Sequence, residues 1–75
     1  MNAIETIRLF AEANETFKGV MFATGRISYI IDNVVTDENY RTWLECTKMS
    51  EKGKTTKCKI QYNDLKNYKT IVIYN

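Results

Sequence analysis

FKGVMFATGRISYIID, residues 17–32, is the stretch that decides the fold. Apolar residues alternate with polar or small ones on both sides of Thr24-Gly25, and this period of two is typical of β-strands. A turn at Thr24-Gly25 therefore predicts a β-hairpin whose alternate residues share one apolar face. The expected cross-strand pairs are Phe22 with Ile27, Val20 with Tyr29 and Lys18 with Ile31.

A helix is the alternative for the second half of this stretch and the residues that follow it. The apolar residues there, Ile27, Ile30, Ile31, Val34 and Val35, also recur at helical spacing. The hairpin is favoured because β-branched residues and tyrosine, which are abundant here, pack well on a pleated sheet.

Residues 41–62 predict a second hairpin, with strands at 41–49 and 55–62 and a turn at 50–54. Two registers fit this region. A five-residue loop pairs Leu44 with Ile60, Cys46 with Cys58 and Glu45 with Lys59. A tight turn at Lys52-Gly53 instead pairs Trp43 with Tyr62 and Glu45 with Ile60. We favour the five-residue loop, because it separates apolar from charged side chains more cleanly.

The flanking segments supply a helix and a last strand. Asn2, with Glu5 three residues later, predicts a helix start of the capping-box type, and the helix should end near Ala13. The apolar stripe of this helix consists of Ile4, Ile7, Phe10 and Ala11. After a polar connection at 36–39 and a turn at Asn63-Asp64, residues 69–74 predict the final strand.

Together these elements predict one small α+β domain covering residues 1–75. Its N-terminal helix would pack on a small antiparallel sheet of about five strands, made of two hairpins and a C-terminal strand. With 75 residues and 44% hydrophobic content, the chain has enough apolar surface for a single small core.

Composition predicts a cytoplasmic protein, in the host cell cytoplasm if it is phage-encoded, without membrane contact. Asn2, Glu5 and Arg8 interrupt any apolar leader, and the run 71–74 is too short to cross a bilayer. Cys46 and Cys58 fit neither a C-x-x-C motif nor a disulfide-rich scaffold, so we expect reduced, buried thiols. A redox-sensitive pair across the hairpin is the alternative.

Catalytic groups are scarce in this sequence. The chain has no histidine, which is the commonest general base at neutral pH and the commonest metal ligand. Its three glycines lie far apart and form no phosphate-binding loop, and its two cysteines cannot complete a zinc site without other ligands. We therefore expect no enzyme activity, no catalytic residues, no metal site and no cofactor.

The charge distribution gives the main indication of function. Residues 1–45 carry a net charge of −3, whereas residues 46–75 carry one of +5. A cationic hairpin attracts polyanions or an acidic protein surface. The residues that we predict to contact a partner or a nucleic acid are Lys48, Lys52, Lys54, Lys57, Lys59, Lys66, Lys69 and Tyr68.

Each of these features also has a purely structural explanation. Lysines on a hairpin can be solvated and can prevent edge-to-edge aggregation. The aromatic residues near them could stack on unpaired bases, although aromatic residues in strands usually pack in the core, and we favour core packing for Trp43. These aromatic residues are Trp43, Tyr62, Tyr68 and Tyr74. The acidic N-terminal half could also form a contact patch of its own.

In outline, the small size, the helix-plus-sheet pattern and the lack of catalytic groups resemble phage-encoded inhibitors of host defence or transcription, including anti-CRISPR proteins. The abundance of residues with AT-rich codons agrees with a phage or mobile-element origin. The resemblance implies a viral, non-enzymatic protein that acts by occupying a surface on a host protein or nucleoprotein complex and so inhibits or modulates nucleic-acid handling.

Two further hypotheses remain from the residues themselves. The first is a small DNA- or RNA-binding regulator that contacts phosphates through the lysine-rich hairpin. The second is a homo-oligomer joined through an exposed edge strand, with residues 69–74 as the expected seam.

Overall fold

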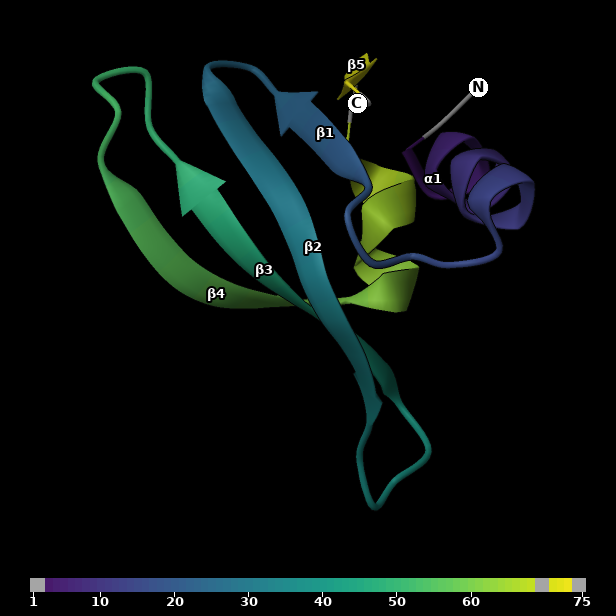
Figure 1. Cartoon of the computed structure of the whole chain (residues 1–75). Helices are drawn as coiled ribbons and strands as arrows, with labels where there is room; N and C mark the ends of the chain where they lie inside the picture. The colour runs from purple at the N-terminus through teal and green to yellow at the C-terminus, as the bar shows by residue number, and fades with distance from the viewer. Residues whose placement is uncertain (1–2, 69–70, 74–75) are drawn as a thin grey trace.

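The computed structural model describes residues 3–68 and 71–73 and shows an α+β fold (Figure 1). Its elements are helix α1 (Ala3–Asn14), strands β1 (Met21–Thr24), β2 (Ile27–Thr36), β3 (Thr42–Met49) and β4 (Thr55–Gln61), the 3₁₀ helix η1 (Tyr62–Asn67) and strand β5 (Ile71–Ile73). The strands form an antiparallel sheet in the order β4-β3-β2-β1-β5. The predicted fold class is therefore confirmed. The expected number of about five strands is slightly off, because four strands form the body of the sheet and β5 covers only three of the described residues.

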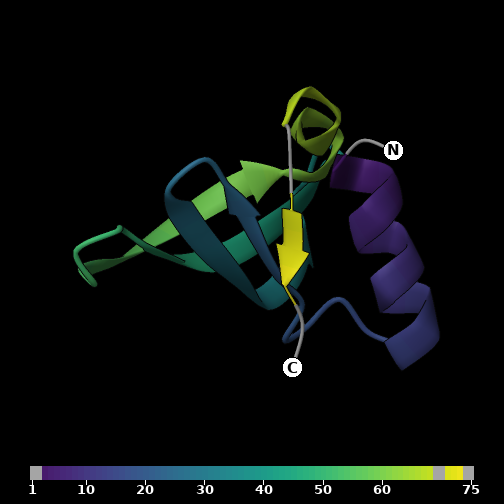
Figure 2. The ribbon, with the colours of Figure 1, turned by 90° about the horizontal axis from the view of Figure 1, so that it is seen from above.

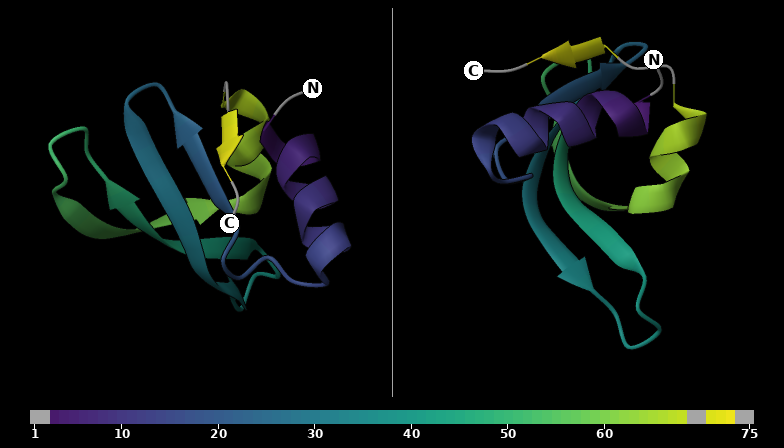
Figure 3. Two further views of the ribbon diagram at one scale, coloured as in Figure 1. Left: turned by 45° about the horizontal axis from the view of Figure 1, so that its top comes forward. Right: turned by 90° about the vertical axis from the view of Figure 1, so that its right-hand side faces the viewer.

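Helix α1 and helix η1 lie on the same face of the sheet (Figures 2 and 3). The core fills the space between these two layers. Its buried residues are Ala3, Ile7, Val20, Phe22, Tyr29, Ile31, Leu44, Cys46, Ile60 and Leu65. The predicted helical stripe is confirmed, because Ile7 and Ala11 are buried while Ile4 and Phe10 pack partly against the core. The expected N-cap, Asn2, lies outside the described residues.

The first hairpin has the predicted faces but not the predicted register. Its turn is Gly25-Arg26, so Phe22 pairs with Tyr29 and Thr24 with Ile27. The Phe22 and Tyr29 rings stack at a centroid distance of 4.9 Å, and such pairs contribute about 0.5–1.5 kcal/mol beyond their buried area. Gly25 has a φ of 62°, which suits the first loop position of a hairpin turn. The alternative helix is wrong, because residues 27–36 form β2.

The second hairpin has the predicted five-residue loop. Leu44 pairs with Ile60, Cys46 with Cys58 and Glu45 with Lys59, so this register is confirmed. The predicted turn at Asn63-Asp64 is wrong. Residues 62–67 instead form η1, which buries Leu65 against the core.

Strand β2 is longer than predicted. Its last residues, 33–36, pair with residues 42–45 of β3, and with the connection at 37–41 they form an arm that projects from the body of the molecule (Figure 1). The register between β2 and β3 shifts between Ile31 and Asn33, which makes Asp32 the extra residue of a β-bulge. At the tip of the arm, Asp37 accepts hydrogen bonds from the Asn39 and Arg41 amides, both at 2.9 Å.

Candidate functional site

Four cationic residues belong to the end of the sheet where both hairpins turn, and Figure 1 shows that the two turns lie at the same end. Lys48 lies near the end of β3, Lys52 and Lys54 lie in the loop that follows, and Arg26 lies in the first turn. We call this set the basic end. Glu51 lies in the same loop, and its Oε2 is 3.5 Å from Arg26 Nη1. Because both side chains are mostly exposed, this ion pair adds little to stability, and the five residues carry a net charge of +3.

Hydrogen bonds hold the second hairpin loop in shape. The Ser50 amide donates to the Lys54 carbonyl at 2.9 Å, and the Gly53 amide donates to the Ser50 carbonyl at 2.9 Å. The Lys54 amide also donates to Ser50 Oγ at 3.2 Å. A hollow of about 280 Å³ lies against this loop. It is lined by Ile27, Lys48, Ser50, Lys54 and Thr56, and most of its lining surface is apolar.

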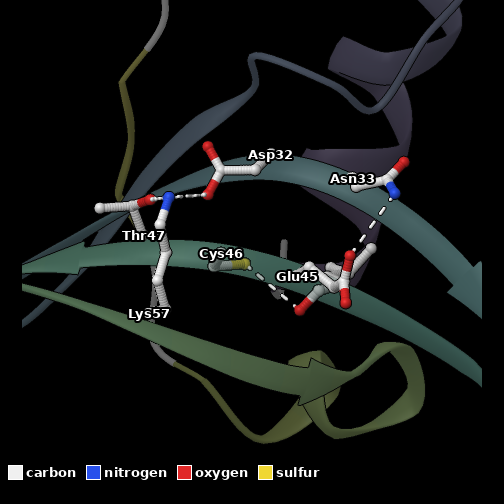
Figure 4. A network of polar contacts seen from close by, with 7 residues as sticks. Asp32, Asn33, Glu45, Cys46, Thr47 and Lys57 are labelled. Atoms are coloured by element: carbon white, nitrogen blue, oxygen red, sulfur yellow. Dashed lines mark hydrogen bonds and ion pairs between the residues drawn. The ribbon is translucent and has the colours of Figure 1, made fainter.

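Lys57 contacts Asp32 and Thr47 on the face of the sheet that α1 and η1 leave uncovered (Figure 4). Its Nζ is 3.3 Å from Asp32 Oδ2 and donates to Thr47 Oγ1 at 2.7 Å, while Thr47 donates to Asp32 at 2.6 Å. The hydrogen bond from Thr47 is the largest single contribution that lowers the pKa of Asp32, and Lys57 lowers it further. Asp32 lies on the same face as Thr47 and Lys57 because it follows Ile31, which is buried in the core, and successive side chains of a strand alternate between faces.

Lys59 is also close to an acid, because it pairs directly with Glu45 in the sheet register. Glu45 in turn accepts a hydrogen bond from Asn33 Nδ2 at 3.4 Å (Figure 4). Lys57 and Lys59 follow the alternation of β4 onto the uncovered face, whereas Lys48 pairs with Thr56 on the opposite face. The lysines of residues 48–59 therefore form two groups and not one continuous cationic face.

The other predicted contact residues lie away from the basic end. Lys66 is exposed on η1, on the far side of the sheet from the hairpin turns (Figure 1). Tyr68 is half-buried against the core, and burial, with a smaller contribution from Asp64, raises its pKa. Lys69 lies outside the described residues. The structure therefore does not place Lys66 and Tyr68 beside the basic end.

The prediction of core packing for Trp43 is wrong. Trp43 is half-buried on the arm and lies outside the core cluster, and its Nε1 donates to Asp37 Oδ2 at 2.9 Å. Tyr62 does pack against the core, with its ring edge-to-face with Phe17 at a centroid distance of 5.7 Å. The Trp43 ring is therefore held by the tip of the arm, while the Tyr62 ring is held by the core.

Cys46 and Cys58 lie directly opposite each other on β3 and β4, and both are free cysteines. Burial raises the pKa of the Cys46 thiol to about 12. Burial is also the main cause that raises the pKa of Cys58, although Lys48 opposes it. Because the thiolate is the reactive form of cysteine, neither residue is activated as a nucleophile at neutral pH.

A groove that the sequence analysis did not predict lies between α1, η1 and the arm. It has a volume of about 530 Å³. The most buried residues that line it are Leu44 and Ala11. Its walls are apolar and include Phe17, Tyr62 and Val34. Three charged residues lie on its rim, namely Arg8, Glu12 and Glu15. The sequence shows the apolar stripe of α1 but not the angle at which the arm leaves the body, and this angle creates the groove.

Comparison with known proteins assigns no family to this chain. No protein-family model, no curated protein and no solved structure matches it. Within residues 3–68 and 71–73, no three or more cysteines and carboxylates are grouped as metal ligands would be. No helix in the same residues is long and apolar enough to span a membrane. The geometry described above therefore provides the basis for a functional proposal.

Proposed function

We propose that this chain is a non-enzymatic binding protein, encoded by a phage or mobile element, that inhibits or modulates a nucleic-acid-handling machine of its host. It acts by occupying a surface, and its partner is a host protein or nucleoprotein complex. The observation that supports this proposal is the basic end. Arg26 and Lys48 lie there beside the hydrogen-bonded loop that carries Lys52, Lys54 and one carboxylate, Glu51.

The basic end suits recognition for two physical reasons. A local net charge of one sign steers an oppositely charged partner and raises the association rate. The backbone of the loop at 50–54 is already held by its own hydrogen bonds, so little backbone entropy is lost when Lys52 and Lys54 meet a partner. Lys57 and Lys59 contribute less, because Asp32 and Glu45 lie beside them.

Charge reversal at the basic end tests this proposal. Lys52→Glu with Lys54→Glu should abolish co-purification of a stoichiometric partner from a host lysate, and should slow association in proportion to the loss of charge. The matched control is Lys18→Glu with Arg41→Glu, which makes the same change of charge at exposed positions elsewhere. Equal loss of the partner with both double variants would show that the contact depends on net charge and not on the basic end.

Direct binding of DNA or RNA is the second candidate function. It is favoured by the closeness of Lys48 and Lys54 around one hollow beside the loop, because two ammonium groups there could neutralise a phosphate. A labelled duplex or single strand should then bind less tightly as salt rises. Lys48→Gln with Lys54→Gln should reduce the slope of log affinity against log salt by about 2. An unchanged slope would exclude these lysines as phosphate contacts.

A further inference from the structure

The groove between α1, η1 and the arm is a second recessed surface, distinct from the basic end. Its volume of about 530 Å³ lies within the range of roughly 300–1,000 Å³ that is usual for ligand pockets. Most of its exposed lining is apolar, with Phe17 and Tyr62 on one side and Val34 on the arm. Val34 is 36% exposed, which is high for a valine beside a hydrophobic core.

Negative charge dominates the rim of this groove. Glu12 lies in the last turn of α1 and Glu15 directly follows the helix, where the helix dipole places partial negative charge. The last turn of α1 contains no basic residue. Arg8 lies one turn earlier on the rim, but within the described residues neither carboxylate forms an ion pair with it. These carboxylates are thus available to a cation from another molecule.

We propose that this groove binds an amphipathic, basic segment of a partner protein. Aliphatic side chains of the segment would enter the groove beside Phe17 and Val34, and its lysine or arginine side chains would pair with Glu12 and Glu15 on the rim. A nucleic acid is disfavoured as the occupant, because its phosphates would meet these carboxylates. This surface shares no residue with the basic end, so the inference stands whether or not the basic end binds a partner.

A labelled peptide provides a direct test with the intact chain. The probe carries leucines and lysines in an amphipathic helical pattern, and its binding is followed by fluorescence anisotropy. Two peptides of equal length serve as references, one with glutamate in place of lysine and one with serine in place of leucine. We expect saturable binding of the leucine–lysine peptide alone, with amide NMR shifts concentrated at Thr16, Val34 and Thr42, which line the groove.

Variants of the chain separate the groove from general electrostatic attraction. Glu12→Gln with Glu15→Gln should weaken peptide binding by about three- to tenfold, as expected for two exposed ion pairs. Val34→Lys should weaken peptide binding more than this double variant does, because the substitution adds a positive charge and removes an apolar side chain from the wall of the groove. The matched control, Glu38→Gln with Glu45→Gln, removes two carboxylates that do not line the groove and should leave binding unchanged. Circular dichroism checks that each variant is folded.

Several outcomes would overturn the inference. Equal weakening by the two glutamine double variants, or equal binding of either reference peptide, would show that the groove does not select an amphipathic basic segment. A doubling of the molecular mass that Val34→Lys abolishes would identify a second copy of the chain as the occupant. Lys52→Glu with Lys54→Glu should leave peptide binding intact, so failure of this inference can be told apart from failure of the proposed function.

Discussion

Asp37 illustrates how one side chain can organise a whole segment of this small protein. Its Oδ1 accepts from the amides of Asn39 and Arg41, and its Oδ2 accepts from Trp43 Nε1. Its own amide donates to the Arg41 carbonyl at 3.0 Å, which closes the tip of the arm. The hydrogen bond from Trp43 is the largest of the contributions that lower the pKa of Asp37. Ionised Asp37 is therefore the form that holds the tip together.

The lowered pKa of Asp37 predicts a specific dependence of stability on pH. Because the folded-state pKa lies below the ordinary value of 3.8, the stabilisation is complete above that value and is lost as the pH falls through the folded-state pKa. Asp37→Asn should lower the free energy of unfolding at neutral pH, and its difference from the wild-type protein should shrink in acid. Urea unfolding at a series of pH values, followed by Trp43 fluorescence, measures this difference. A difference that stays constant with pH would contradict the assignment.

At the same scale, Asp32 shows why the sequence could not tell which of the predicted contact lysines lie beside an acid. The alternation of β4 places Lys57 and Lys59 on one face, and this much can be read from the residues. The partner of Lys57 cannot, because Asp32 is 25 positions away in the sequence and comes beside it only when β2, β3 and β4 pair. The bulge at Asp32 changes instead which faces Asn33 and Val34 occupy.

At the scale of elements, side-chain alternation was more informative than turn chemistry. The apolar face of the first hairpin was predicted correctly, because moving the turn from Thr24-Gly25 to Gly25-Arg26 preserves which residues share a face. The cross-strand partners changed, since Gly25 takes the first loop position and Phe22 then stacks on Tyr29. In the second hairpin the separation of charged from apolar residues was enough to select the observed register.

The end of α1 provides a prediction about an element boundary. The Thr16 amide donates to the Ala11 carbonyl at 3.0 Å, a bond that closes a helix end of the Schellman type with Glu15 in the left-handed region at a φ of 59°. Glycine takes this conformation without the steric cost that other residues incur. Glu15→Gly should therefore be more stable than Glu15→Ala by about 1 kcal/mol, since only the alanine variant keeps the strain.

Urea unfolding of the two Glu15 variants measures this difference. Both variants remove the same carboxylate from the negative end of the helix dipole, so the comparison isolates the backbone conformation. Glu15→Ala itself should be slightly more stable than the wild-type protein, by roughly 0.3–1 kcal/mol, because that carboxylate is unfavourable there. Equal stability of the glycine and alanine variants would mean that Glu15 is not held in the left-handed region in solution.

At the scale of the whole molecule, the two charged halves of the sequence become two separated surfaces. The basic end lies where both hairpins turn (Figure 1), and the groove with its acidic rim is lined by residues of α1, η1 and the arm. The change of charge along the chain predicted the lysine-rich hairpin as a contact region and left an acidic patch in the N-terminal half open. The sequence could not predict that the groove is larger than the hollow beside the loop at 50–54, because the size of the groove depends on how α1, η1 and the arm pack. A nucleoprotein partner could supply phosphates to one surface and a basic segment to the other.

The edges of the sheet lead to a prediction about self-association. The strand order leaves β4 at one edge and β5 at the other, and β4 has seven residues against three in β5. An edge strand of this length offers unpaired backbone groups to a second chain, and lysines on such a strand oppose that pairing. Lys57→Thr with Lys59→Thr should therefore promote concentration-dependent association, seen as a rising mass in light scattering.

The control, Lys18→Thr with Lys52→Thr, lowers the net charge from +2 to 0 in the same way but leaves β4 intact, and it should not promote association. Association of both variants alike would mean that net charge, and not the lysines of β4, keeps the chains apart.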